Sequence, residues 1–160
     1  MPLKVNQVER LFLLFFFLIA TTVAFAQTNP DAIVGDWLTT DKNAIIRCYK
    51  QGNQYFGKVI WYAPFIEAEE GHPIDPAENT KYLNALVMKN FVFADNEWSG
   101  GRILDLPHNK NYTAFARLNK KNQLEVTGYM FFRWLSQTLT LEKANTNVVE
   151  NYIRTSNLNR

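Results

Sequence analysis

Apolar and polar residues alternate along most of the chain after residue 30, in short runs separated by turn-forming residues. Alternation with period two is typical of strands with one buried face, and the regular spacing of the runs is typical of an antiparallel meander. The pattern predicts nine strands, in the runs IVGDWLTT, NAIIRCYK, QYFGKVIWY, ALVMKNFVFA, WSGGRILDL, NYTAFARL, QLEVTGYMFF, LSQTLTLEK and NVVENYIR. So many strands in one open sheet would leave edges unpaired, so we expect an all-β fold, either a closed barrel or a two-sheet sandwich.

One interval, residues 63–84, interrupts this alternation. It contains three prolines and an acidic cluster, through which a strand cannot run. Within it, Asp75 is placed to cap a helix whose first residue is Pro76, and we expect a short helix from Pro76 to about Leu83. A long loop of this kind either covers the rim of a barrel or is a surface excursion without a role.

The first residues have the order of a secretory signal peptide. Lys4 and Arg10 precede the apolar run from Leu11 to Ala20, and small residues follow up to Ala26. We expect cleavage after Ala26, which leaves a single domain, residues 27–160, that is periplasmic or secreted. The alternative is an uncleaved anchor, but the apolar run is shorter than the roughly 20 residues that a spanning helix needs.

Charge and cysteine content narrow the class of protein further. Without residues 1–26 the chain keeps 15 basic and 14 acidic side chains, a balance that argues against nucleic acid as a partner. Cys48 is the only cysteine, so no internal disulfide can form. Its place in an alternating apolar run predicts a buried, inert thiol.

Residues able to carry catalysis are few. His72 and His108 are the only histidines, and neither has the spacing of a metal ligand pair. Glu69 and Glu70 lie in the acidic loop, where solvated carboxylates are expected rather than a dyad that shares a proton. There is no phosphate-binding loop and no nucleophile elbow. The sequence therefore predicts a protein that is not an enzyme and needs no metal or cofactor.

The segment WSGGRILDLPHNKNY, residues 98–112, combines several structural signals. Gly100 and Gly101 predict a bulge, a bend at a barrel corner or a close backbone approach, and Trp98 is expected to cover the exposed backbone. Asp105 should accept backbone N–H bonds in a hairpin connection, and Asn109 is suited to a left-handed conformation there.

This segment resembles the signature of a family of small secreted bacterial proteins, the domain of unknown function 2147: Trp-x-Gly-Gly-x-Ile-Tyr-Asp-Pro-x-x-Gly-Lys-x-Tyr. Leu104, Leu106 and Asn109 replace its Tyr, Pro and turn Gly. Other features of the family are also found in order, namely GDW, YFGKVIW, an Asp-Pro segment at Asp75, VTGYM and LSQTLTL. The resemblance implies a mainly architectural role for the motif residues, which are Gly35, Trp37, Gly57, Trp98, Gly100, Gly101, Asp105, Lys110, Tyr112, Gly128 and Gln137.

The resemblance also implies a fold like that of the calycins, which include the lipocalins: an antiparallel barrel of about eight to ten strands. In lipocalins the Trp of a Gly-x-Trp motif packs across the barrel floor under an Arg from a late strand. Gly35 and Trp37 match the first part of this arrangement. Leu141 stands where the Arg is usual, so Arg133 or Arg154 would have to replace it.

A barrel of about eight strands either is filled by side chains or holds one small ligand. Alternation places Tyr55, Val59 and Trp61 on one face with Gly57, and inward glycines such as Gly57 and Gly128 would leave room for a ligand. We therefore expect a small, largely apolar ligand, with Arg102 or Arg117 as a polar anchor. The candidate ligand contacts are Tyr55, Trp61, Phe115, Arg117 and Met130.

Two other functions remain open at the level of sequence. The first is a filled barrel whose loop at residues 63–84 contacts another envelope protein or a cell-wall polymer. The second is an enzyme without a recognisable catalytic motif, because a barrel of this kind can carry many functions.

Overall fold

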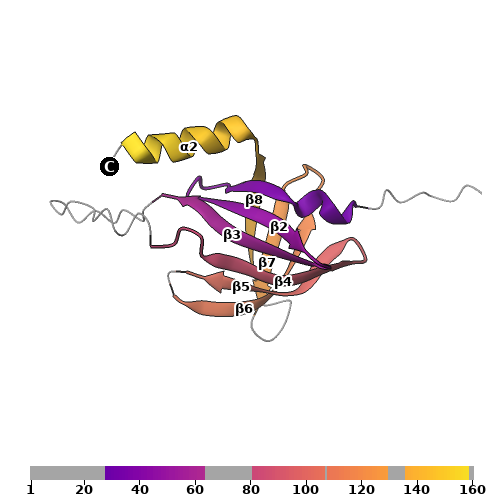
Figure 1. Cartoon of the computed structure of the whole chain (residues 1–160). Coiled ribbons are helices and arrows are strands. Elements are labelled where there is room, and N and C mark those ends of the chain that lie inside the picture. The colour runs from indigo at the N-terminus through magenta and orange to yellow at the C-terminus, as the bar shows by residue number, and fades with distance from the viewer. Residues whose placement is uncertain (1–27, 64–80, 107, 130–135, 159–160) are drawn as a thin grey trace, which may run out of the picture.

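Eight antiparallel strands form a closed barrel in which each strand pairs with the next along the chain, and β8 pairs with β1 (Figure 1). The computed structural model describes residues 28–63, 81–106, 108–129 and 136–158. The strands are β1 (Gly35–Thr39), β2 (Ala44–Gln51), β3 (Gln54–Tyr62), β4 (Leu86–Ala94), β5 (Glu97–Asp105), β6 (Lys110–Leu118), β7 (Leu124–Tyr129) and β8 (Ser136–Ala144). The predicted closed barrel is confirmed.

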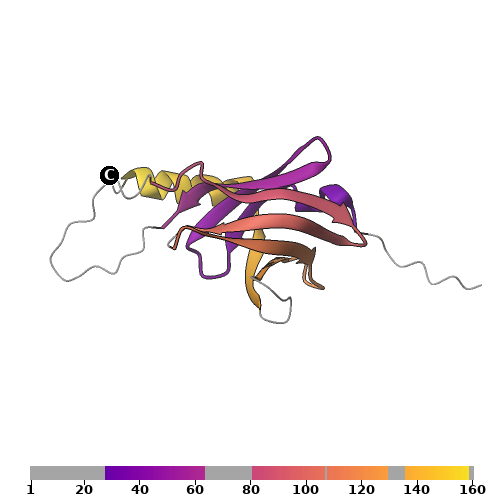
Figure 2. The same cartoon turned by 90° about the horizontal axis from the view of Figure 1, so that it is seen from below.

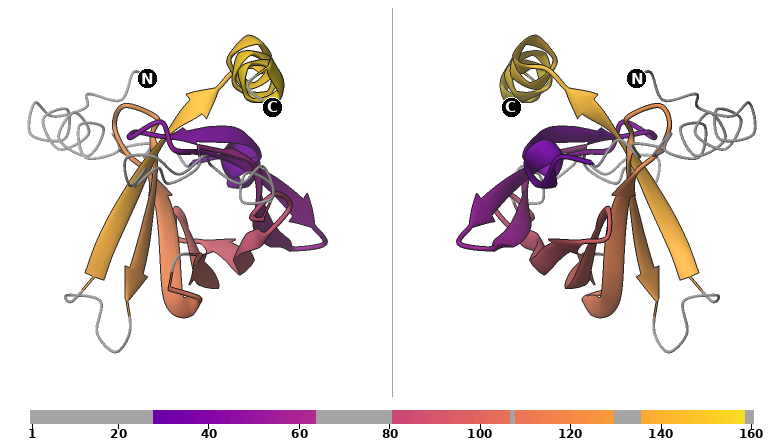
Figure 3. Two further views of the ribbon diagram at one scale, coloured as in Figure 1. Left: turned by 90° about the vertical axis from the view of Figure 1, so that its left-hand side faces the viewer. Right: turned by 90° about the vertical axis from the view of Figure 1, so that its right-hand side faces the viewer.

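The ninth predicted strand is wrong, because the run NVVENYIR lies within a helix, α2 (Thr146–Leu158). Val148, Val149 and Tyr152 recur at helical spacing and pack against the outer face of the barrel, on a cluster that includes Leu38 and Ile45. The side chain of Asn145 accepts the N–H of Val148 at 2.9 Å and caps the first turn. Figure 3 shows this helix end-on, outside the ring of strands.

Several predictions fall on residues outside the described part of the chain. These include the signal peptide, Glu69, Glu70, His72 and the cap at Asp75. The predicted helix from Pro76 to Leu83 also lies mostly outside it, and the described residues 81–84 form a turn. No helix in the described part of the chain is long and apolar enough to cross a membrane.

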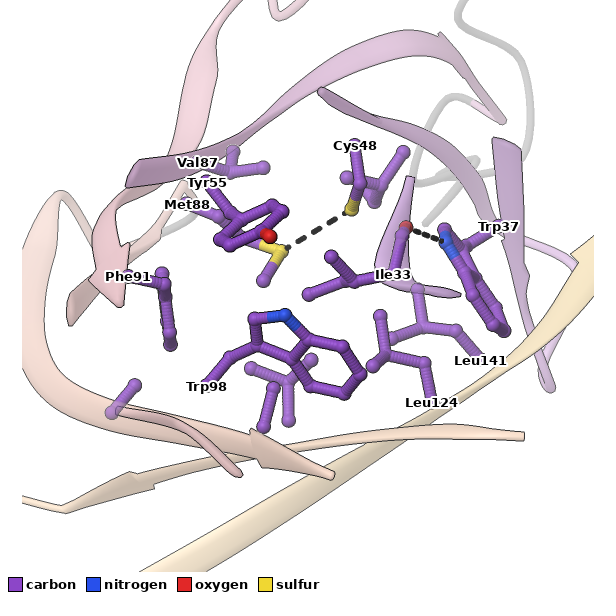
Figure 4. Packing of buried hydrophobic residues seen from close by; sticks show 14 of the residues in the cluster. Ile33, Trp37, Cys48, Tyr55, Val87, Met88, Phe91, Trp98, Leu124 and Leu141 are labelled. Carbon is purple, nitrogen blue, oxygen red and sulfur yellow. Dashed lines mark hydrogen bonds between the residues drawn. The ribbon is translucent and has the colours of Figure 1, made fainter. Parts of the chain in front are cut away.

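One end of the barrel is sealed by a short 3-10 helix, η1 (Pro30–Ile33), which precedes β1. The side chain of Ile33 is fully buried within the core cluster. The indole N–H of Trp98 donates to the Pro30 carbonyl at 2.9 Å. The indole N–H of Trp37 donates to the Ile33 carbonyl at 2.7 Å, as Figure 4 shows. Two buried indoles from different strands therefore hold η1 in place while satisfying their own N–H groups.

The arginine that the resemblance led us to expect over Trp37 is replaced by a lysine. Lys143 pairs with Trp37 across β1 and β8, and its ammonium lies 4.4 Å from the centroid of the indole ring. Arg154 lies on α2 and donates to Asn151 instead, and Arg133 is outside the described residues. The expectation for Arg154 was wrong, since the alignment of β8 with β1 brings Lys143 over the ring.

Cys48 is buried as predicted, with 2% of its surface exposed. Burial raises the pKa of its thiol to about 12, because an anionic sulfur would be desolvated there. Its Sγ lies 3.9 Å from Sδ of Met88 (Figure 4). At neutral pH this thiol is therefore uncharged and poorly reactive.

The glycine pair marks both a bulge and a close approach, as the sequence predicts. The pairing of β5 with β6 shifts between Trp98 and Gly101, and Gly100 has a φ of 70°. A Cβ on Gly101 would collide with the ring of Phe91. The residue that packs on Gly101 is therefore Phe91, and the expectation for Trp98 was wrong because its indole is directed to η1 instead.

A candidate ligand cavity at the open end of the barrel

A cavity of about 940 Å³ opens at the end of the barrel opposite η1. In an antiparallel meander alternate connections lie at the same end, and the cavity is lined by residues at the β1–β2, β3–β4, β5–β6 and β7–β8 connections. Its volume is within the range of roughly 300–1,000 Å³ for small-molecule pockets. The inner wall consists of apolar residues, namely Ile46, Val59, Val87, Met88, Ile103, Val126 and Leu141.

The two inward glycines both lie against side chains of neighbouring strands. The volume next to Gly57 is occupied by Met88 and Ile46, which would lie 3.0–3.1 Å from an added Cβ. Gly128 lines the cavity, and the atom nearest to an added Cβ there is the flexible end of Ile103. Both glycines therefore give space to neighbouring side chains, and Gly128 also lies in the cavity lining. That they leave room for a ligand stays a prediction.

Tyrosines form much of the cavity mouth. The rings of Tyr62 and Tyr82 are 5.2 Å apart, and Tyr112 and Tyr129 line the same cavity. A tyrosine offers an apolar ring together with a hydroxyl that can donate or accept a hydrogen bond. The mouth can therefore hold a ligand whose inner part is apolar and whose outer end is polar.

Two carboxylates belong to the same lining. The carboxylate of Asp41 accepts from the side-chain amide of Asn43 at 3.0 Å, and the pKa of Asp41 is lowered chiefly by a hydrogen bond from Thr39. The carboxylate of Asp105 lies 2.8 Å from Nδ1 of His108 and accepts the His108 N–H at 3.4 Å. Asp105 thus holds its hairpin as predicted, while its side chain stays 28% exposed.

The β5–β6 hairpin also contains the predicted left-handed residue, since Asn109 has a φ of 50°. Lys110 begins β6 directly opposite Asp105. This part of the family motif therefore fixes the turn that carries one of the two carboxylates.

Among the described residues, no strand pairs with the outer edge of the first half of β8, which lies beside the cavity. β1 pairs with β8 from Asp36, opposite Ala144, to Thr39, opposite Leu141. Next to this last pair, the backbone N–H of Thr40 donates to the Thr140 carbonyl. Earlier residues of β8, from Ser136 to Leu139, pair with β7, are exposed and line the cavity. Figure 2 shows β7 and β8 diverging from the strands that begin the barrel. A ligand can therefore reach the cavity from this side.

Tyr55, the first predicted ligand contact, lies at the sealed end instead. Its side chain is buried, and its hydroxyl donates to the carboxylate of Asp31 on η1 at 2.7 Å. It does not line the cavity.

The predicted face of Trp61 was wrong, because β3 contains a bulge. Ile46 pairs with Val59 whereas Ile45 pairs with Trp61, so Ile60 is an extra residue and the alternation changes phase. Trp61 points outward and packs under α2, with its ring 4.5 Å from that of Tyr152. Tyr62 takes the inward position and lines the cavity.

Phe115 and Arg117 also lie on the outer face. The inward positions of β6 are held by Ala114 and Ala116, which are buried. The guanidinium of Arg117 lies 5.2 Å from the centroid of the Phe115 ring and pairs with Glu97. Arg102, the other proposed anchor, is exposed and outside the lining, and Met130 is not among the described residues.

Some motif residues that we expected to be architectural line the cavity instead. These are Asp105, Tyr112, Gly128 and Gln137. Alternation along β6 places Tyr112 on the inward face with Ala114, and alternation along β8 places Gln137 with Leu141. The alternation in the sequence could therefore have identified these lining residues, once it was known which side of each strand faces inward.

In the described ranges, no three side chains among His, Cys, Asp and Glu are close enough to hold a metal ion. The site consists instead of an apolar pocket with a polar, partly acidic mouth.

Comparison with known proteins agrees with this architecture. The model of the family described as "Uncharacterized protein conserved in bacteria (DUF2147)" matches residues 35–143. The solved structure of protein HP1028 from Helicobacter pylori, described as belonging to the lipocalin family, is similar to 76% of this chain and 88% of its own, with a TM-score of 0.53. Sequence identity is 14%, so this similarity shows the fold alone. No curated protein matches the sequence.

Proposed function

Because this chain belongs to the bacterial DUF2147 family and folds as a lipocalin-like barrel, we propose that it binds a small, largely apolar molecule without chemically changing it. The observation that carries this proposal is the cavity of about 940 Å³ with an apolar inner wall and an accessible mouth. We place the binding role in the periplasm or outside the cell, because residues 1–26 have the order of a signal peptide.

The arrangement of the cavity supports this role energetically. Apolar surface removed from water contributes about 25 cal/mol per Å², so a ligand that buries about 250 Å² gains roughly 6 kcal/mol before the cost of association. The closed floor under η1 favours entry from the mouth, and the tyrosines there can orient a polar end group. Because the cavity is already present among the described residues, binding there needs little reorganisation.

The filled-barrel alternative receives less support. It requires side chains to occupy the interior, whereas the described residues leave the cavity open at one end of the barrel. Contact with another envelope component through residues 63–84 depends largely on residues outside the described part of the chain and stays a prediction.

Native mass spectrometry of residues 27–160, purified from the periplasm without denaturation, tests the proposal. We expect a reproducible additional mass, and the matched experiment adds decanol to protein that carries no ligand. Replacing Leu139, which is 46% exposed at the mouth, with Trp should lower decanol affinity about tenfold by filling the space. Thr113→Trp, on the exposed outer face of β6, is the control and should bind like wild type. A bare polypeptide mass in every sample would refute the proposal.

A further inference from the structure

We propose that the polar end of the ligand is uncharged or positively charged, and that the cavity discriminates against carboxylates and phosphates. This inference rests on the proposed function and adds the chemical class of the ligand. It follows from the charges that line the cavity and from the partners of the cations around its mouth.

Apart from the tyrosines, the ionisable side chains that line the cavity are all acidic. Asp41 and Asp105 are the two carboxylates, from the β1–β2 turn and the end of β5. Among the described residues that line the cavity there is no Lys, Arg or His. Within the described lining, a ligand carboxylate would therefore approach two negative groups without a cation to pair with it.

Three basic side chains near the mouth, Lys42, His108 and Lys81, are engaged in other contacts. The ammonium of Lys42 lies 2.7 Å from the carboxylate of Glu142, and His108 pairs with Asp105 itself. The ammonium of Lys81 lies 5.4 Å from the centroid of the Tyr82 ring. Lys110 begins β6 opposite Asp105. An anionic head group would have to compete with a protein acid for Lys42 and His108 and with a tyrosine ring for Lys81. Lys110 lies beside a carboxylate in the strand register, that of Asp105.

An anionic group also loses more than a neutral one on entering the apolar part of the cavity. A charge taken out of water is costly unless it is paired, whereas a hydroxyl needs only one or two hydrogen bonds. The hydroxyls of Tyr82, Tyr112 and Tyr129 can supply such bonds, and tyrosine ring faces attract cations. The mouth therefore favours alcohols and amines over acids.

Three ten-carbon ligands that differ in end group test this inference: decanol, decylamine and decanoate, measured by isothermal titration at neutral pH. We expect decanol and decylamine to bind and decanoate to bind at least about tenfold more weakly than decylamine. This ratio should shrink as salt is added, since the two carboxylates are at the surface. Decanoate binding as tightly as decanol would overturn the inference and leave the proposed function standing. Binding of none of the three would overturn both.

Variants then locate the source of the discrimination. Asp41→Asn combined with Asp105→Asn should bring the decylamine-to-decanoate ratio close to one, because Asn keeps a hydrogen-bond acceptor without the charge. Asp95→Asn, in the β4–β5 turn at the sealed end, is the matched control and should leave the ratio as in wild type. An unchanged ratio in a folded double variant would overturn the inference. If the double variant does not fold, the salt dependence of the wild-type protein decides. A decylamine-to-decanoate ratio that does not fall as salt is added would also overturn the inference.

Discussion

The ammonium of Lys143 on β8 lies 4.4 Å from the centroid of the Trp37 ring on β1, directly across the pair of strands that closes the barrel. The same ammonium donates to the carbonyls of Val34, at 2.7 Å, and Ala32, at 3.2 Å. One side chain of the last strand thus contacts the first strand, the residue before it and η1. It links closure of the barrel to closure of its floor.

Replacing Lys143 tests this link. Lys143→Ala removes two charge-assisted hydrogen bonds and the contact with the ring, and should lower the free energy of unfolding by about 1–2 kcal/mol. Lys143→Arg should retain most of this stability, because a guanidinium can also donate to carbonyls while stacking on an indole. Urea unfolding measures the difference, with Lys120→Ala, an exposed turn lysine, as the control. Equal stability of the Ala variants at both positions would contradict the role of Lys143.

The close packing of Phe91 on Gly101 predicts a steric effect that its neighbour Gly100 should not show. Gly101→Ala places a methyl group in the Phe91 ring and should cost about 3 kcal/mol. Gly100 has no heavy atom within 4 Å of an added Cβ, so Gly100→Ala should cost only about 1 kcal/mol, from its φ of 70°.

A double-mutant cycle separates these two causes. Phe91→Leu should recover part of the loss in Gly101→Ala, because the smaller side chain can move away from the methyl group. It should recover none of the loss in Gly100→Ala. Additive effects of Phe91→Leu and Gly101→Ala in thermal unfolding would show that their contact is not the cause.

The contacts of Asp31 on η1 predict how the stability of the fold depends on pH. Hydrogen bonds from Lys50, at 2.8 Å, and Tyr55, at 2.7 Å, lower the pKa of Asp31 below its ordinary value of 3.8. Since the folded-state pKa is the lower one, this contribution is complete above pH 3.8 and is lost as the pH falls through the folded-state value.

Asp31→Asn should therefore be less stable than wild type at neutral pH, and the difference should shrink below about pH 4. Urea midpoints measured at neutral and acidic pH report the change. Tyr55→Phe removes one of the two donors and should weaken the same pH dependence in part. A difference between Asp31→Asn and wild type that stays constant down to acidic pH would mean that this carboxylate does not titrate with folding.

The barrel could be predicted from the sequence because period-two alternation is recognisable in each of the runs that form its eight strands. The side of a strand that faces inward was harder to predict, as β3 shows. Alternation from Val59 puts Trp61 inside, but the extra residue Ile60 reverses the phase and brings Tyr62 to the cavity. A bulge leaves no clear mark in a run such as KVIWY, because every residue there suits either face.

The helix α2 was missed for a related reason. The run NVVENYIR contains β-branched and aromatic residues that are common in strands, whereas its spacing, with Val149 and Tyr152 on one face, also fits a helix. The barrel was already complete with β8 paired to β1, so the remaining apolar residues pack on the outer surface. Because β8 already pairs with β1, this run has no strand left to pair with in the barrel, and it forms a helix instead.

The position of Trp61 leads to a prediction that separates its packing role from ligand binding. Its indole N–H is buried and has no hydrogen-bond partner among the described residues. Trp61→Phe removes this donor while keeping an aromatic ring against Tyr152 and α2, so stability should be unchanged or higher by up to about 1 kcal/mol. Trp61→Ala leaves a gap under the helix and should cost about 2–4 kcal/mol.

Neither substitution should alter decanol affinity, because Trp61 lies outside the cavity lining. Titration of both variants with decanol, beside urea unfolding, measures the two effects separately. A loss of affinity in Trp61→Phe at wild-type stability would place the ligand beneath α2 and not in the barrel. An unchanged affinity in Trp61→Phe together with reduced affinity in Leu139→Trp would instead locate it at the open end, beside the free half of β8.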